Sequence, residues 1–107
     1  MKSIGLSEKD IELIRSVFVK HKEVEMVWLY GSRSMGNYKP ASDIDLCMEG
    51  NQLNFSLLMC IENELDDLYL PYRIDLSLLK DIKNQDLRDH ISRRGIVFYA
   101  REALQPI

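Results

Sequence analysis

The sequence predicts a domain of the α/β or α+β class, in which helices cover a β-sheet. Segments whose apolar residues recur at helical spacing alternate along the chain with short apolar or alternating runs that are typical of strands. The 107 residues are 46% hydrophobic and 29% charged, the balance of an ordinary globular protein. No repeat, low-complexity tract or linker interrupts the chain, so residues 1–107 are expected to form a single domain.

The first half of the chain predicts a helix, a strand and a broken loop. A helix is expected over about 7–22, because Ser7 and Asp10 form an N-cap pair and apolar residues follow at helical spacing. A strand over Val24–Tyr30 is rich in β-forming apolar residues, which suggests burial on both faces. Residues 32–42 hold glycine, asparagine and proline, so we expect a loop with at most one short helical turn.

The second half predicts three strands and two helices. Asp43–Met48 alternates carboxylate and aliphatic residues, which indicates a strand with one polar face. An amphipathic helix over about 58–68 is followed by a second alternating strand at Tyr72–Ser77. A helix over 84–95 opens on a capping asparagine and closes on two arginines and a glycine. Ile96–Tyr99 is expected to be a last short strand.

Charge and hydropathy exclude several classes of function. Fourteen basic and seventeen acidic residues give a net charge of −3 and a pI near 5.3, the wrong sign for a protein that holds nucleic acid by its backbone. No apolar run approaches the roughly 18–20 residues of a membrane span. The start, MKSIGLSEKD, has no apolar core for a signal peptide. We therefore expect a soluble, cytoplasmic protein that binds neither nucleic acid nor membrane.

The cysteines and histidines favour structural roles. Cys47 and Cys60 form no C-x-x-C pair, and they are interpreted as reduced core cysteines outside any disulfide framework or zinc site. His21 is placed at a helix C-terminus, where a positive charge suits the macrodipole. His90 lies on a mostly polar helix face without a partner at metal-ligand spacing, which indicates a solvated side chain.

Two carboxylates mark the first alternating strand. Asp43 and Asp45 point to the same face, about 6–7 Å apart, where their charges repel each other. That arrangement is tolerable if the strand end is wet, or if divalent cations such as Mg²⁺ take the oxygens as ligands. Asp75, on another half-polar strand, joins them if the two strands are neighbours. Three such carboxylates can hold two metals about 3.5–4 Å apart, the geometry used for phosphoryl or nucleotidyl transfer.

A glycine and a serine precede these carboxylates. Gly31 and Ser32 open an irregular turn after a strand, where a missing Cβ lets backbone amides approach a phosphate. Arg33 and Lys39 are candidates to neutralise that phosphate. The structural alternatives are a turn glycine, a helix-capping serine and ordinary loop charges. Gly-Ser at a fixed offset from Asp-x-Asp is expected roughly 0.003 times by chance, which favours the functional interpretation.

The stretch GSRSMGNYKPASDIDL resembles the signature of the DNA polymerase beta-like nucleotidyltransferase superfamily, in which Gly-Ser is followed after ten residues by Asp-x-Asp. Similar segments extend from about residue 27 to 79, and the short chain looks like the minimal nucleotidyltransferase group. The resemblance implies a mixed β-sheet flanked by helices and makes Asp75 the third carboxylate. The residues of this chain that fall on the signature are Gly31, Ser32, Gly36, Ser42, Asp43, Asp45 and Leu46.

The resemblance also implies an activity. It implies transfer of AMP from ATP, or of another nucleotide from its NTP, to a hydroxyl with two Mg²⁺ ions. Asp43 and Asp45 would ligate both ions, while Asp75 would hold one and assist deprotonation of the hydroxyl. The turn formed by Gly31, Ser32 and Arg33 would bind phosphates.

The same group is commonly encoded beside a HEPN-domain protein, as the antitoxin of a toxin–antitoxin pair. The resemblance thus implies that the acceptor is a tyrosine of a HEPN partner, in a hetero-oligomer, with a homodimer as the other assembly. An alternative function is a non-catalytic antitoxin that neutralises its partner by occlusion. Two interpretations of Arg73 also stay open, since it shares a face with Asp75: it pairs with that carboxylate or it contacts the α-phosphate.

Overall fold

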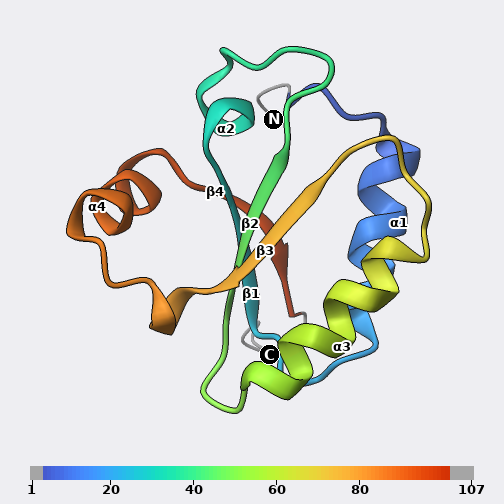
Figure 1. Cartoon of the computed structure of the whole chain (residues 1–107), viewed down its shortest axis with the longest axis vertical. Coiled ribbons are helices and arrows are strands. Elements are labelled where there is room, and N and C mark those ends of the chain that lie inside the picture. The colour runs from blue at the N-terminus through green and yellow to red at the C-terminus, as the bar shows by residue number, and fades with distance from the viewer. Residues whose placement is uncertain (1–3, 102–107) are drawn as a thin grey trace, which may run out of the picture.

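The computed structural model describes residues 4–101, which fold as a four-stranded mixed sheet with helices on both faces (Figure 1). The strand order is β3-β2-β1-β4, with β1 antiparallel to β2 and β4, and β2 parallel to β3. This confirms the α+β class. The elements are α1 (Glu8–Val19), β1 (Met26–Tyr30), α2 (Ser32–Met35), β2 (Ile44–Glu49), α3 (Phe55–Asp66), β3 (Ile74–Leu78), the 3-10 turn η1 (Leu79–Asp81), α4 (Gln85–Arg94) and β4 (Ile96–Ala100).

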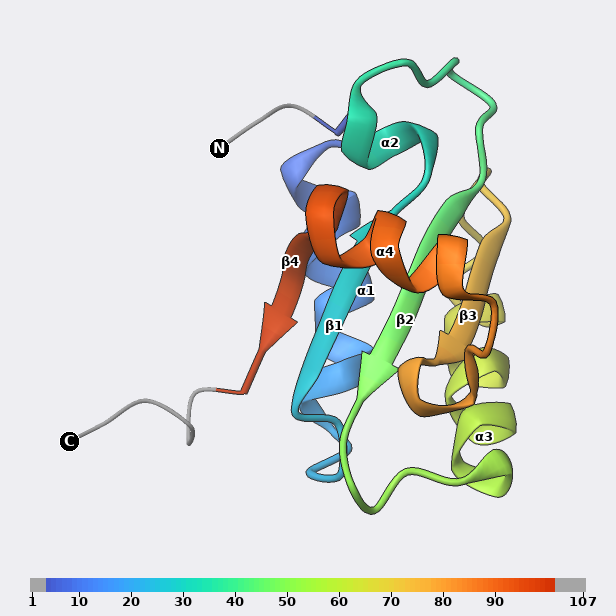
Figure 2. The same ribbon diagram turned by 90° about the vertical axis from the view of Figure 1, so that its left-hand side faces the viewer.

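The helices divide unequally between the two faces of the sheet. Figure 2 shows α4 in front of the sheet and α1 and α3 behind it, while the single turn of α2 sits at the end of β1. The main apolar core lies between the sheet and the pair α1 and α3. Of the helices within residues 4–101, none is long and apolar enough to cross a membrane. The core includes Ile14, Phe18, Val27, Leu29, Ile44, Leu46, Met48 and Ile61.

Side-chain caps fix the starts of the long helices, as two of the sequence patterns predicted. The Ser7 hydroxyl accepts a hydrogen bond from the backbone N–H of Asp10 at 3.1 Å. The Asn84 side chain accepts one from the N–H of Leu87 at 3.0 Å. Each cap satisfies a backbone donor that the first helical turn leaves unpaired. The C-terminus of α1 differs from the expectation, because the helix ends at Val19 and His21 lies beyond it.

The prediction that β1 is buried on both faces is wrong for one face. Val27 and Leu29 are fully buried on the side of α1 and α3, whereas Trp28 and Tyr30 are only half-buried on the side of α4. The physical reason is that one ten-residue helix covers this face, while two helices of twelve residues cover the other. The open part of the α4 face exposes the polar ends of the strands.

The two cysteines occupy different environments. Cys47 is buried in β2, as expected of a core cysteine, and burial raises the pKa of its thiol to about 12. Such a thiol stays protonated and unreactive at neutral pH. Cys60 is exposed on α3, so the expectation of a core position is wrong for this residue. The apolar side of α3 is carried instead by Ile61 and Leu65.

Candidate active site

Three aspartates lie together where β2 and β3 begin. Because the two strands are parallel and in register, Asp45 is directly opposite Asp75. Asp43 directly precedes β2, two residues before Asp45, and is close enough for its negative charge to act on Asp45. The structure therefore makes the two predicted strands neighbours and brings Asp75 to the other carboxylates.

Burial and repulsion by neighbouring negative charges both raise the pKa of Asp45. This carboxyl is half-buried, whereas Asp43 and Asp75 are exposed. The pKa of Asp45 is raised, first by burial and then by the negative charges of Asp75 and Asp43. The positive charge of Arg73 acts in the opposite direction. The cluster thus concentrates negative charge on oxygen atoms, and hard divalent cations such as Mg²⁺ prefer such ligands.

Arg73 contributes charge without pairing. Within residues 4–101, no ion pair joins Arg73, which directly precedes β3, to Asp75 of that strand, although both residues are exposed. Arg73 influences Asp45 through its charge alone. Of the two interpretations that the sequence left open, direct pairing with Asp75 is not formed.

Tyr30 of β1 lies beside the aspartates, so that polar side chains lie next to one another on three neighbouring strands. It is the register partner of Asp45 in the antiparallel pair of β1 and β2, so Tyr30, Asp45 and Asp75 form one line across the sheet. Burial raises the pKa of its phenol, and the negative charges of Asp45 and Asp75 act in the same direction. The sequence interpretation of Tyr30 as a core residue missed this position, because the strand was expected to be buried on both faces.

Gly31 is required by a close approach of the backbone to Asp45. Its φ of 80° lies in the left-handed region that favours glycine. A Cβ atom built at this position would lie 2.4 Å from Oδ2 of Asp45, closer than any side chain allows. The turn therefore passes directly beside the carboxylate, and both the positive φ and this close approach favour glycine.

His90 is a site residue that sequence reasoning missed. Its Nε2 accepts a hydrogen bond from the backbone N–H of Gly31 at 3.0 Å. Its ring also stands edge-on to the ring of Tyr30, with centroids 6.3 Å apart. The expectation of a solvated histidine is wrong, because the face of α4 that carries His90 packs onto the end of β1. The amide that was expected to meet a phosphate thus has a partner within the chain.

The prediction that the Arg33 side chain neutralises a phosphate is wrong. Only 1% of Arg33 is exposed, and all five of its N–H donors point to backbone carbonyls at 2.9–3.4 Å. Its guanidinium also lies over two tyrosine rings. Arg33 therefore holds the loop together and has no donor left for a ligand. The carbonyls belong to Ile4, Gly5, Pro40 and Ser42, and the rings to Tyr38 and Tyr72.

A hollow beside the glycine turn offers other positive charges. Ser32 is half-buried at the first position of α2, next to Gly31. A hollow of about 340 Å³ opens between α2 and α4, and it is lined by both acidic and basic groups. No sequence pattern related these α4 residues to the glycine turn. The lining residues are Met35, Asp86, Asp89, His90, Arg93 and Arg94.

Most of the chain matches one family of proteins. The sequence model of the family described as "Polymerase beta, Nucleotidyltransferase" matches residues 12–103, which include the glycine turn and all three aspartates. No curated protein matches the chain in sequence.

Solved structures share the fold. A crystal structure described as a toxin–antitoxin with AMP-PNP has a TM-score of 0.66 at 21% identity, over 92% of this chain and 77% of that chain. The toxin–antitoxin MntA–HepT has a TM-score of 0.65 at 14% identity, over 91% and 75%. A tri-AMPylated Shewanella oneidensis HEPN toxin in complex with an MNT antitoxin gives 0.57 at 19% identity, over 89% and 70%. At these identities the likeness shows a common fold.

Proposed function

Because the chain belongs to the Polymerase beta, Nucleotidyltransferase family, we propose that it transfers a nucleoside monophosphate, AMP in particular, from an NTP to a hydroxyl group with the help of Mg²⁺. One observation carries the proposal. The register of β2 and β3 places Asp75 opposite Asp45, with Asp43 on the same side. Three carboxylates converge there at a strand end, beside a turn whose backbone conformation and close approach to Asp45 favour glycine.

The three aspartates are proposed to have different roles. Asp43 and Asp45 are the ligands proposed for two Mg²⁺ ions, and Asp75 for one of them. When bound, Mg²⁺ neutralises charge on the transferred and leaving phosphates and favours the ionised acceptor hydroxyl. Asp75 is exposed, so an approaching hydroxyl can reach it and pass its proton to the carboxylate. Half-buried Asp45 is held more rigidly, which suits a ligand.

The triphosphate is proposed to lie over the glycine turn. The hydroxyl of Ser32 and the N–H of Gly31 are donors for phosphate oxygens, provided that His90 releases the amide. Since Arg33 is buried and fully hydrogen-bonded, it cannot neutralise the phosphates. Arg93 and Arg94 line the hollow beside the turn, and they are the cations proposed for this role.

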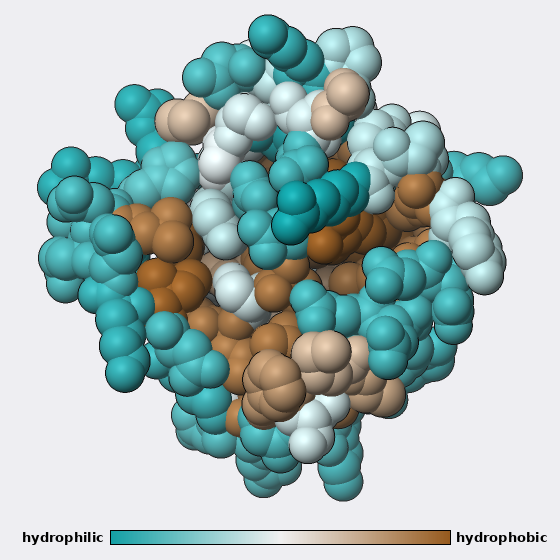
Figure 3. All heavy atoms as spheres, viewed as in Figure 1, coloured by the Kyte–Doolittle hydropathy of each residue, from teal (hydrophilic) through white to brown (hydrophobic). Residues whose placement is uncertain are grey.

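A HEPN-domain partner is proposed to supply the acceptor hydroxyl, from a tyrosine, in the cytoplasm. Two observations support a partner. The complex from Shewanella oneidensis contains an AMPylated HEPN toxin with an MNT antitoxin. Apolar side chains also reach the surface of this chain, as the brown areas of Figure 3 show for one face. The exposed large apolar residues include Val19, Met35, Phe55, Met59, Tyr69 and Val97.

A mass measurement tests the proposal. The chain is incubated with Mg²⁺, each NTP in turn and the HEPN-type protein encoded nearby, and intact masses of both proteins are recorded. We expect the partner to gain nucleoside monophosphates with the wild type and with Asp67→Asn, a matched change of the exposed aspartate that follows α3. Asp45→Asn should give none. A stable complex without any transfer would favour the alternative of a non-catalytic antitoxin.

A further inference from the structure

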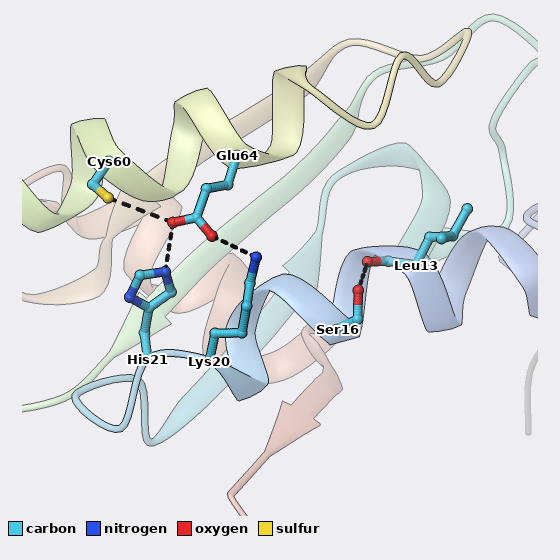
Figure 4. A network of polar contacts seen from close by, with 6 residues as sticks. All are labelled: Leu13, Ser16, Lys20, His21, Cys60 and Glu64. Carbon is cyan, nitrogen blue, oxygen red and sulfur yellow. Dashed lines mark hydrogen bonds and ion pairs between the residues drawn. The ribbon is translucent and has the colours of Figure 1, made fainter.

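A second polar cluster lies on the other side of the sheet, between α1 and α3. His21 follows the end of α1, whereas Cys60 and Glu64 are one helical turn apart on α3. Figure 4 shows the three side chains pointing toward one another. Nε2 of His21 lies 2.7 Å from Oε2 of Glu64, and Sγ of Cys60 lies 3.4 Å from the same oxygen.

The contacts of Glu64 separate its two oxygens. Oε1 pairs with the ammonium of Lys20 at 2.9 Å, and this leaves Oε2 for both His21 and Cys60. One nitrogen, one sulfur and one oxygen atom therefore face a common point, all within 4.8 Å of one another. In the absence of a metal, protons on the imidazole and the thiol hold this arrangement together.

We propose that His21, Cys60 and Glu64 bind one Zn²⁺ ion, with water as the fourth ligand. Zn²⁺ is bound in proteins by imidazole nitrogen, thiolate sulfur and carboxylate oxygen, usually with tetrahedral geometry. Mg²⁺ prefers oxygen ligands alone, so the aspartates and this cluster select different metals. The proposal is independent of the transfer reaction, because no residue is shared between the two sites.

Two of the three ligand separations are close to those around tetrahedral Zn²⁺, and the third, between Nε2 and Sγ, is at most 4.8 Å. Tetrahedral Zn²⁺ with bonds of about 2.0–2.3 Å places ligand atoms about 3.3–3.5 Å apart. The separation of Sγ and Oε2, 3.4 Å, already has this value. The separation of Nε2 and Oε2, 2.7 Å, must open by about half an ångström. Both side chains are half-buried, with 17% of His21 and 26% of Glu64 exposed, so this opening requires only a small side-chain rotation.

The charges also balance on binding. The Cys60 thiol loses its proton to solvent, and the imidazole keeps one proton, on Nδ1, so that Nε2 can bind the metal. Two negative ligands then neutralise Zn²⁺, while Lys20 stays on the outer oxygen of Glu64 and orients the carboxylate. The bound ion would tie the segment after α1 to α3. It would therefore stabilise the native state by mass action.

Cobalt spectroscopy with the full chain tests the site. Co²⁺ titrated into reduced protein should give a thiolate-to-metal charge-transfer band that saturates at one equivalent, and Zn²⁺ should abolish the band. The aspartate site has no sulfur and cannot produce it. Cys60→Ser should remove the band, and Glu64→Gln should weaken Co²⁺ binding by at least about tenfold. Glu62→Gln, a matched change on the same helix, should leave binding unchanged.

Three results would overturn the proposal. These are the absence of a charge-transfer band in the wild type, a band of equal strength in Cys60→Ser, and equal binding by Glu64→Gln and Glu62→Gln. Circular dichroism confirms that each variant is folded, which is expected because Cys60 is exposed. His21→Gln gives an independent check, because it removes the ligand that α3 does not carry.

Discussion

The aspartate cluster and the His21–Cys60–Glu64 cluster differ in how their charges are balanced. In the first, Asp43, Asp45 and Asp75 repel one another, and Arg73 offsets them only through its charge. In the second, the Glu64 carboxylate accepts from Lys20, His21 and Cys60, and the contact with Lys20 is the main cause of its lowered pKa. Without a ligand, the carboxylates of the aspartate cluster repel one another. In the other cluster, hydrogen bonds to the Glu64 carboxylate balance its charge.

The difference reflects what holds each cluster in place. Strand pairing fixes the backbone positions of Asp45 and Asp75, so only rotation of the side chains can relieve the repulsion. The side chains of the second cluster come from a helix and from the residues after a helix, and they can turn to find partners. The aspartate cluster is therefore preorganised to bind cations. The His21–Cys60–Glu64 cluster must first lose the protons that hold it together before it can bind a metal ion.

The largest effect is expected from Asp45→Asn. Loss of this metal ligand should lower the rate of nucleotide transfer by at least about a thousandfold. The same change should leave the free energy of unfolding of the metal-free protein unchanged or slightly higher. Burial and like charges raise the pKa of Asp45, so folding favours its protonated form. The stability that this group contributes is present below its ordinary pKa of 3.8 and is lost as the pH rises through the raised value.

Two measurements check this prediction. Transfer is followed by mass, and metal-free stability by urea unfolding at pH 7 and at lower pH. The advantage of Asp45→Asn over the wild type should shrink as the wild-type carboxyl becomes protonated. A variant that is less stable than the wild type at pH 7 without metal would show that Asp45 serves the fold rather than the ligand.

Arg33→Lys should cost about 3 kcal/mol of folding stability, because an ammonium cannot satisfy the carbonyls that the buried guanidinium reaches. This change distinguishes the two clusters, because it loosens the loop beside the aspartates and leaves the His21–Cys60–Glu64 cluster unchanged. Urea unfolding measures the loss. Lys39→Arg, an exchange at an exposed position of the same loop, is the control and should change little. Equal stabilities of the two variants would contradict the scaffold role of Arg33.

His90→Ala should tighten ATP binding about fivefold, since one hydrogen bond of about 1 kcal/mol no longer competes for the Gly31 amide. Calorimetric titration with ATP and Mg²⁺, compared with Ser92→Ala on the same helix, measures the change. Weaker binding by His90→Ala would mean that His90 supports the phosphate site instead of competing with it.

The smallest effect is expected from Glu64→Gln in the absence of metal. The pair of Glu64 and Lys20 is near the surface, so its loss should change the free energy of unfolding by less than about 1 kcal/mol. Lys20 holds the pKa of Glu64 below its ordinary value of 4.5, and the contribution is therefore present above that pH and lost as the pH falls through the lowered pKa. Thermal unfolding at pH 7 and pH 3 measures it. A larger loss at pH 3 than at pH 7 would contradict this assignment.

The sequence by itself determined the fold class, the helix caps and which aspartates share a face. Ser7 and Asn84 act as caps because a capping bond joins residues only three positions apart. Asp43 and Asp45 lie on one side because side chains alternate along any strand. The offset of Gly31 from the aspartates was equally visible, since the residues of this turn and strand are close in the chain.

Only the tertiary structure decided which residues of different helices, strands and loops contact one another. It placed His90 on the amide of Gly31, buried Arg33 under its own loop, and brought His21 to Glu64 from 43 positions away. Periodicity reports the side of an element on which a residue lies, because local backbone geometry sets that side. Which residue of another element contacts that side chain depends on how the helices pack over the sheet. That packing is set by the whole core, so no local pattern encodes it.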